Sequence, residues 1–298
     1  MSFSLSTLIQ QIINGLSLGS VYALIAVGYS LVYSILLFSN FAHGGFLVVG
    51  GYACYFLLTQ WGYGVAVSMA GALLASGITA ILTERLAYKP IRERTSLTLY
   101  LLIASMGVNV IIENLFVVTV GGRVRALPQN TFPTGVFSLW GGVTLSASDI
   151  LSLVTAVIFL SLLQIFLTRT RWGLAVRAAS YDIKTAGLMG VNVPFLISLV
   201  FFVAGVLAAV GGIFLSVRYT LYPQLGSITT KAFIAAVIGG LGSLPGAVVG
   251  SLILGLAEML TAGFISSQMR DLVVYSLLVI MLLFRPAGFF GKEIREKV

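Results

Sequence analysis

The sequence contains few of the side chains on which enzyme active sites and metal centres depend. Only 9% of its 298 residues are charged, whereas soluble proteins have about 25%. Its single cysteine, Cys54, excludes a disulfide framework, and its single histidine, His43, excludes a metal cluster or a histidine proton relay. No HExxH, CxxC, GxSxG or Walker A pattern is present. We therefore expect no catalytic residues, no metal and no cofactor, and so a protein that is not an enzyme.

Hydrophobic residues, in contrast, make up 58% of the chain, which is more than one soluble core can bury. Lipid is therefore the expected solvent for most of this surface. The first apolar run has no basic residues before it and no small-residue cleavage site, so we expect a retained span and not a signal peptide. The 17 basic residues lie mostly in short loops between apolar runs. The positive-inside rule explains these basic residues, and we expect no nucleic acid partner.

The apolar runs predict an all-α, polytopic membrane helix bundle in a single transmembrane domain, residues 1–298. Each run is long enough to cross about 30 Å of hydrocarbon at about 1.5 Å per residue. A further apolar stretch, residues 229–260, is interrupted by GSLPG at residues 242–246, which predicts a kink, a re-entrant turn or a tight hairpin. The uninterrupted runs are residues 8–37, 41–60, 64–83, 97–120, 149–167, 191–217 and 269–284.

Loop charges predict the orientation of the bundle, because basic residues collect on the cytoplasmic side. The loop of residues 121–148, in which Arg123 and Arg125 are the only basic residues, suits the outer face. The run of residues 191–217 leaves the cytoplasm, and the last run must start outside to end in the basic tail. Residues 229–260 must therefore enter the membrane and return as two short helices. This gives about nine crossings with the N-terminus outside, or eight if the first run bends back. The basic residues expected on the cytoplasmic side are Arg85, Lys89, Arg92, Arg94, Arg169, Arg171, Arg177 and Lys184, and in the tail Arg285, Lys292, Arg295 and Lys297.

Small residues recur four positions apart within several of the apolar runs. In lipid, where van der Waals contact replaces the hydrophobic drive, such spacing lets helix backbones approach closely. The spacing fits packing within one chain, and it also fits contact with a partner in the membrane. The pairs are Gly15/Gly19, Gly242/Gly246 and Gly246/Gly250, and Ala204, Ala208 and Gly212 form a series.

A polar stripe runs along one predicted helix, where Ser105, Asn109 and Glu113 follow one another at intervals of four. Such a stripe can line a translocation path. It can equally be a hydrogen-bond network between helices, with Glu113 close enough to the outer end to reach water. His43 lies beside Asn40, near a cytoplasmic span junction. There it fits a gate on the same path, or a helix-end cap or packing residue.

Other ionisable residues within the apolar runs are few. Glu258 and Lys231 fall near the outer ends of the two short helices, where we expect water to solvate them. A proton- or sodium-coupled transporter usually needs carboxylates near the membrane midplane, and Glu113 is the one serious candidate. If the chain moves a solute uphill, we expect the energy to come from another subunit.

Between two apolar runs the chain reads TRTRWGLAVRAASYDIKTAGLMGVN, residues 168–192. Its spacing predicts one short amphipathic helix at the cytoplasmic surface, with Arg177 and Lys184 outside the apolar stripe and Asp182 able to cap a turn. Such a helix fits the docking of a component from outside the membrane, and it also fits binding to anionic lipid. The residues of the stripe are Leu174, Ala178, Tyr181, Thr185 and Leu188.

Several stretches resemble the permeases of ABC importers for branched-chain amino acids, the LivH-type family. The sequence GLAVRAASYDIKTAGLMGVNV is similar to the cytoplasmic coupling loop of that family. Residues 14–52 are similar to its first two segments, and residues 239–258 and 282–291 to its closing part. The resemblance covers nearly the whole chain in the same order. Its most diagnostic motifs are Phe41-Ala42-His43-Gly44 and Phe284-Arg285-Pro286.

The resemblance implies a role for the polar loop. Residues 169–190 would be the coupling loop that seats in a groove of a cytoplasmic ATPase. This would make the loop the place where ATP hydrolysis on a separate subunit acts on the chain. The residues that the resemblance and the loop charges single out there are Arg177, Asp182, Lys184, Ala186 and Gly190.

The resemblance also implies an assembly in the bacterial inner membrane, with the C-terminus of this chain in the cytoplasm. Its partners would be a second, homologous permease, two ATPase subunits that use the ATP, a binding protein on the outer side, and membrane lipid. The assembly would import branched-chain or other neutral amino acids by alternating access. The family also contains permeases for urea and short amides. Outside the family, a secondary transporter that uses Glu113 and a passive channel for small neutral solutes are the alternatives.

Overall fold

A computed structural model describes residues 5–95, 97–128, 132–133, 135–138 and 142–291. The chain divides into two compact units, which are treated separately below. The first consists of residues 1–30, 132–157 and 230–298, and the second of residues 31–131 and 158–229. Helix α1, Leu5–Leu36, and helix α6, Ala147–Arg169, each contribute to both units.

Helices dominate the described residues, and seven of them are long and apolar enough to cross a membrane. An eighth apolar helix, α2 (His43–Thr59), is shorter. The all-α prediction is confirmed, whereas the number of crossings stays a prediction. Five of the seven are single helices: α1, α6, α5 (Thr98–Val120), α9 (Val193–Tyr219) and α11 (Leu244–Phe264). The sixth is continuous from α3 (Val65–Thr83) through a π-helical turn (Glu84–Tyr88) to α4 (Lys89–Arg94). The seventh is α12 (Arg270–Phe284) with the short 3-10 turn Ser267–Met269 before it.

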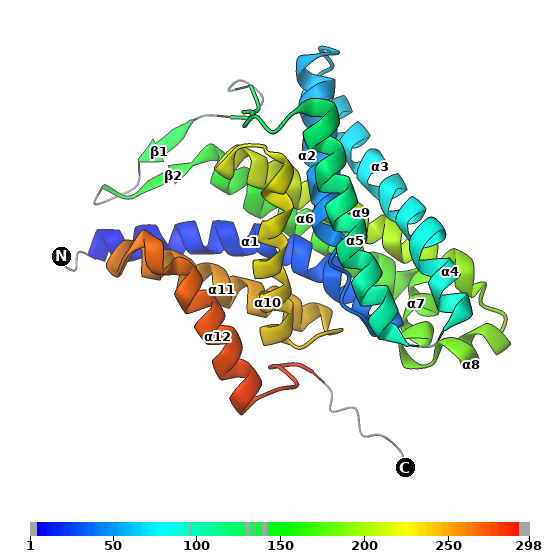
Figure 1. Cartoon of the computed structure of the whole chain (residues 1–298). Helices are drawn as coiled ribbons and strands as arrows, with labels where there is room; N and C mark the ends of the chain where they lie inside the picture. The colour runs from blue at the N-terminus through cyan, green and yellow to red at the C-terminus, as the bar shows by residue number, and fades with distance from the viewer. Residues whose placement is uncertain (1–4, 96, 129–131, 134, 139–141, 292–298) are drawn as a thin grey trace. The chain divides into compact units, whose positions relative to one another are not determined.

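Helices α2, α3 and α9 pack tightly in the second unit, and Figure 1 shows them running close together. The backbones meet at glycines. A Cβ placed on Gly50 would lie 2.6 Å from the Cα of Ala209, and one on Gly212 would lie 2.4 Å from the Leu47 carbonyl oxygen. Ser76 of α3 donates a hydrogen bond to a backbone carbonyl on each of the other two helices, at 2.8 and 2.7 Å. The predicted close approach at Gly212 is confirmed.

The first unit is built on a similar contact between α1 and α11. A Cβ on Gly15 would lie 2.9 Å from the Cα of Leu256, and one on Gly255 would lie 2.6 Å from the Cα of Gly19. Only glycine at these positions lets the two backbones touch. The predicted Gly15/Gly19 pair therefore forms a helix crossing within the chain.

The interrupted apolar stretch forms a helical hairpin of α10 (Thr229–Gly239) and α11, which confirms the predicted return near GSLPG. Gly242, with φ of +83°, adopts the left-handed conformation that the turn requires. The two arms touch at Gly239 and Gly246, where a Cβ on Gly239 would meet the Gly246 carbonyl oxygen at 2.0 Å.

The prediction of two short helices is wrong for the second arm of this hairpin. Helix α10 has 11 residues, but α11 has 21. Ser243 caps the start of α11 by accepting a hydrogen bond from the Gly246 amide, and Pro245 occupies the first turn. Proline is tolerated there because the amides of a first turn have no partner within the helix. The Pro that interrupts the sequence pattern thus begins a helix instead of breaking one.

The loop between α5 and α6 contains a small β-hairpin that the sequence pattern did not predict. Strands β1 (Val136–Ser138) and β2 (Thr144–Ser146) pair antiparallel. Gln10 of α1 anchors the second strand, because its side chain donates to the Thr144 carbonyl and accepts from the Thr144 amide, at 2.9 and 2.7 Å. These contacts lie within the first unit.

Candidate functional site

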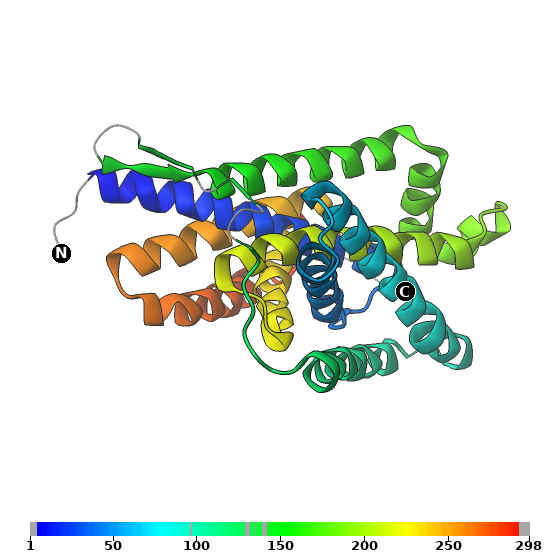
Figure 2. The ribbon, with the colours of Figure 1, turned by 90° about the horizontal axis from the view of Figure 1, so that it is seen from above.

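The polar loop begins with a sharp turn at the end of α6. Thr170 caps helix α7 (Arg171–Tyr181) by accepting a hydrogen bond from the Gly173 amide at 2.9 Å. Gly173 is pressed against α6, since a Cβ there would lie 2.2 Å from the Phe166 carbonyl oxygen. Glycine at this position lets the chain turn sharply at the end of α6, as Figure 2 shows.

The loop contains two helices, so the prediction of one is wrong. Asp182 has extended backbone angles and separates α7 from α8 (Ile183–Leu188). Its carboxylate accepts hydrogen bonds from the amides of Lys184 and Thr185, at 2.8 and 3.2 Å, and from the Thr185 hydroxyl. The predicted capping role of Asp182 is confirmed. The Thr185 hydroxyl, with the two amides, lowers the pKa of the Asp182 carboxyl.

The apolar stripe predicted for this loop faces outward. Leu174 is 60% exposed, Tyr181 82% and Leu188 88%. The opposite face is made of small residues and is buried. Its members are Gly173, Val176, Ala179 and Ala186. The small side chains of the loop are therefore packed, and its large side chains are exposed.

The predicted coupling residues fall on both faces. Arg177, Asp182, Lys184 and Gly190 are exposed, and Ala186 is buried. Gly190 has φ of +90°, which suits glycine, and ends the loop just after α8. The exposed members share the outer face with the three large apolar side chains.

The far end of the loop is attached to α9. Asn192 caps α9 by accepting a hydrogen bond from the Phe195 amide at 3.2 Å. The rings of Trp172 in α7 and Phe195 in α9 lie 4.8 Å apart. A displacement of α7 would therefore bear directly on the first turn of α9.

The predicted polar stripe on α5 faces α2. Ser105 is buried and accepts a hydrogen bond from the Phe41 amide at 3.0 Å. Asn109 donates to Glu113 at 2.9 Å. A Cβ on Gly44 would lie 3.1 Å from Asn109 Oδ1, so the stripe and the start of α2 are in contact.

The break between α1 and α2 lies against this stripe. Leu37 has φ of +52°, a conformation uncommon for a residue with a side chain. Asn40 is buried in the break and accepts a hydrogen bond from the Tyr88 hydroxyl at 2.7 Å. His43 begins α2, and its buried ring packs edge-on against Phe46. The structure thus gathers Asn40, His43, Ser105 and Asn109 around the start of α2, with Glu113 one turn further along α5.

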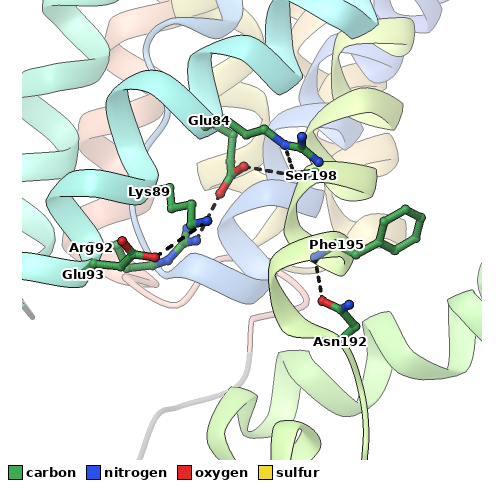
Figure 3. A network of polar contacts seen from close by, with 8 residues as sticks. Glu84, Lys89, Arg92, Glu93, Asn192, Phe195 and Ser198 are labelled. Atoms are coloured by element: carbon green, nitrogen blue, oxygen red, sulfur yellow. Dashed lines mark hydrogen bonds and ion pairs between the residues drawn. The ribbon is translucent and has the colours of Figure 1, made fainter.

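A buried carboxylate that the sequence analysis did not single out lies at the π-helical turn after α3. Glu84 accepts hydrogen bonds from Arg92 of α4 and from Ser198 of α9, both at 3.0 Å, as Figure 3 shows. The π-helical turn itself marks the position, because such turns are frequent at functional sites. The spacing of eight residues between Glu84 and Arg92 is a signal that could have indicated one shared helix face.

A second buried carboxylate corrects an expectation. Glu258 and Lys231 were expected to be solvated, but only 1% of the Glu258 side chain is exposed. Lys231 binds Glu258 at 2.9 Å and Asp271 at 2.8 Å, and the Tyr22 hydroxyl donates to Glu258 at 3.0 Å. The partners come from α1, α10, α11 and α12, so side chains of neighbouring helices pair with these charges.

Comparison with known proteins places the chain in a family. The model of the branched-chain amino acid transport system / permease component family matches residues 11–282. The chain is 37% identical to the high-affinity branched-chain amino acid transport system permease protein LivH of Salmonella typhimurium, over 97% of each chain. It is 36% identical to the corresponding protein BraD of Pseudomonas aeruginosa, over 97% of this chain and 98% of that one. It is 27% identical to the probable permease LivH of Methanocaldococcus jannaschii, over 91% and 88%.

The resemblance that the sequence motifs indicated is therefore confirmed. The match covers both units of the structure, including the loop of α7 and α8 and the hairpin of α10 and α11. A permease component is a multi-pass membrane subunit of an ABC transporter and not itself an enzyme. The chain belongs to the family of branched-chain amino acid transport system permease components.

Proposed function

We propose that this permease subunit imports branched-chain or other neutral amino acids by alternating access, driven by ATPase subunits that bind its α7–α8 loop. The outward-facing apolar and basic residues of that loop carry the proposal. Soluble surfaces rarely leave several large apolar side chains together in the open unless a partner or a membrane covers them. The arrangement therefore calls for a covering partner on this face.

The chemistry of the loop favours a protein partner over lipid. A helix that lies on a membrane turns its apolar face into the lipid and its basic residues outward. Here Arg177 and Lys184 share the exposed surface with Leu174, Tyr181 and Leu188. A groove with an apolar floor and acidic rim would match this surface, with aromatic and aliphatic anchors in its centre.

The link from the loop to the bundle is short. The ring contact between Trp172 and Phe195 and the cap at Asn192 join the loop to the first turn of α9. Helix α9 in turn packs on α2 and α3 through glycine contacts. Because such tight interfaces shift between discrete packings, movement of the loop would be transmitted to the helices around the polar stripe.

We further propose that the solute passes along the polar face between α2 and α5. The Asn40 side-chain nitrogen and Asn109 Oδ1 are buried and have no hydrogen-bond partner among the described residues. One donor and one acceptor are thus available to a solute beside the break between α1 and α2. Transporters commonly place interrupted helices at the solute site. The Glu113 carboxylate one turn away favours an amino acid, with its ammonium group, over urea or a short amide.

The remaining features of the assembly follow from the family. We propose a single permease domain with about nine crossings in the bacterial inner membrane, with its C-terminus and the α7–α8 loop in the cytoplasm. Its partners are a second homologous permease, two ATPase subunits and a binding protein on the outer side. Selectivity would then rest largely with the binding protein, which fits the few polar groups on the path.

Charge reversal in the loop tests the docking role. The double variant Arg177→Glu with Lys184→Glu should insert normally but lose ATP-driven uptake and co-purification with the ATPase subunits. The exposed Arg123, in the α5–α6 loop, provides a control, since Arg123→Glu should leave both unchanged. Uptake by the double variant at the rate of the unaltered protein would overturn the docking role. Binding measurements on the partner binding protein, with branched-chain amino acids and urea side by side, test the solute class.

A further inference from the structure

A polar cavity opens between the π-helical turn after α3 and the starts of α4 and α9, away from the polar stripe. Its volume is about 430 Å³, within the range of small-ligand pockets. Every lining residue belongs to the second unit. They are Glu84, Arg85, Lys89, Asn192, Pro194, Phe195 and Ser198.

The charge of this cavity is positive once the internal pairs are considered. Both oxygens of Glu84 are engaged, one by Arg92 and the other by Ser198. Among the described residues, Arg85 makes one long contact, from Nε to Ser198 at 3.4 Å, and Lys89 lies 3.9 Å from the exposed Glu93. The guanidinium and the ammonium therefore keep most of their donors available at the wall. The positive end of the α9 dipole adds to the same field.

Under the topology proposed above, the cavity also lies at the cytoplasmic level of the lipid headgroups. Glu84 follows directly on the apolar helix α3, and Pro194 stands in the first turn of the apolar helix α9. The end of the apolar segment of one long helix and the start of another therefore flank it. Figure 3 shows Glu84 beside Ser198 of α9, with Asn192 and Phe195 at the start of the same helix. Basic pockets between helices at the cytoplasmic surface bind anionic headgroups.

We propose that this cavity binds the phosphate group of an anionic phospholipid, with Arg85 and Lys89 as its ligands. The planar fork of Arg85 matches two phosphate oxygens, and Lys89 supplies a second, mobile charge. Phe195 offers an apolar wall to the glycerol backbone. The site would hold a lipid whichever solute the permease carries, so it stands apart from the proposed transport path.

The test uses the full chain in phosphatidylcholine nanodiscs, with bound lipid counted by native mass spectrometry. Added phosphatidylglycerol should bind to the unaltered protein in preference to added phosphatidylcholine, with an affinity that falls as salt is raised. If the unaltered protein shows no preference for phosphatidylglycerol, that result alone overturns the proposal. Displacement of phosphatidylglycerol by millimolar inorganic phosphate would overturn the lipid as the source.

Variants locate the site. The double variant Arg85→Gln with Lys89→Gln should weaken phosphatidylglycerol binding by about 25-fold, from about fivefold for each basic residue near an acidic lipid. Arg123→Gln removes the same kind of charge elsewhere in the second unit and should bind as the unaltered protein does. Glu93→Gln releases Lys89 from its exposed carboxylate and should bind slightly more tightly. Equal binding by the double variant and Arg123→Gln would contradict this location, even if both variants fold normally.

Discussion

The α2–α3–α9 core and the α7–α8 loop use small residues in the same way but place their large residues differently. In both, glycine or alanine lets one backbone lie against another, as at Gly212 in the core and Gly173 in the loop. Large side chains at the contacts between the core helices are buried, among them Phe46 and Phe201, whereas others on α3, such as Leu74 and Ile78, are exposed. The large side chains of the loop, such as Leu188, are exposed. Contacts between the core helices account for their buried large residues, whereas Leu174 and Leu188 on the outer face of the loop are largely exposed and so point to a partner.

Enlarging a core glycine should have the largest effect on stability. Gly212→Leu would drive a side chain into the Leu47 backbone, which cannot move aside as a flexible side chain would. We expect a loss of about 3 kcal/mol or more and little folded protein in the membrane. The measurement is thermal unfolding in detergent together with membrane yield.

The matched substitution in the loop sharpens this comparison. A Cβ on Gly187 of α8 meets only the Val193 side chain, at 3.5 Å. Gly187→Leu should therefore leave the melting temperature close to that of the unaltered protein. An equal loss in both variants would mean that Gly187 is packed as tightly as Gly212, contrary to the structure.

Removing the Glu84 carboxylate should have an intermediate effect, because it joins α4 to the core helix α9. Glu84→Ala leaves Arg92 without its carboxylate and Ser198 without its acceptor. Since Arg92 is partly exposed, we expect a loss of about 2 kcal/mol, below the range for fully buried pairs. Chemical denaturation measures this loss. Lys89→Ala, which removes a mostly solvated pair, should cost less than about 0.5 kcal/mol, and a reversal of this order would contradict the account.

Acidification should have the smallest effect, confined to the loop. The pKa of Asp182 is lowered in the folded loop, so its capping is fully present above the ordinary aspartate pKa and is lost as pH falls through the folded pKa. Hydrogen exchange of the Ile183–Leu188 amides should therefore speed up below about pH 4, relative to α7. Asp182→Asn keeps a capping oxygen and should remove this pH dependence. The same acid response in Asp182→Asn would exclude Asp182 as its source.

Helix positions were predictable because apolar runs end where charge or glycine begins. The run predicted at residues 97–120 is the observed Thr98–Val120, which Gly121 terminates. The GSLPG interruption indicated the hairpin, but local sequence alone did not show that Ser243 and Pro245 would begin a long helix. The cap at Asp182 was foreseen, although its consequence, two helices in place of one, was not.

The environment of charged residues was less predictable, because it depends on contacts far apart in the sequence. Glu258 is buried because Tyr22, 236 positions earlier, and Lys231 reach it from other helices. Glu84 is buried by Ser198, 114 positions later. The outward direction of the loop stripe was also not foreseen, since helical spacing shows which residues share a face but not which face packs.

Site-directed cross-linking of the assembled transporter tests the docking role of the α7–α8 loop most directly. Single cysteines at Leu188 and Tyr181, on the exposed face, should cross-link to the ATPase subunits produced together with the chain. A cysteine at Ala179, on the buried face, should not. The native Cys54 is buried in α2 and should therefore not form cross-links itself. Cross-linking at Leu188 and Tyr181 alone is the result we predict, and equal or absent cross-linking at all three positions would contradict the account.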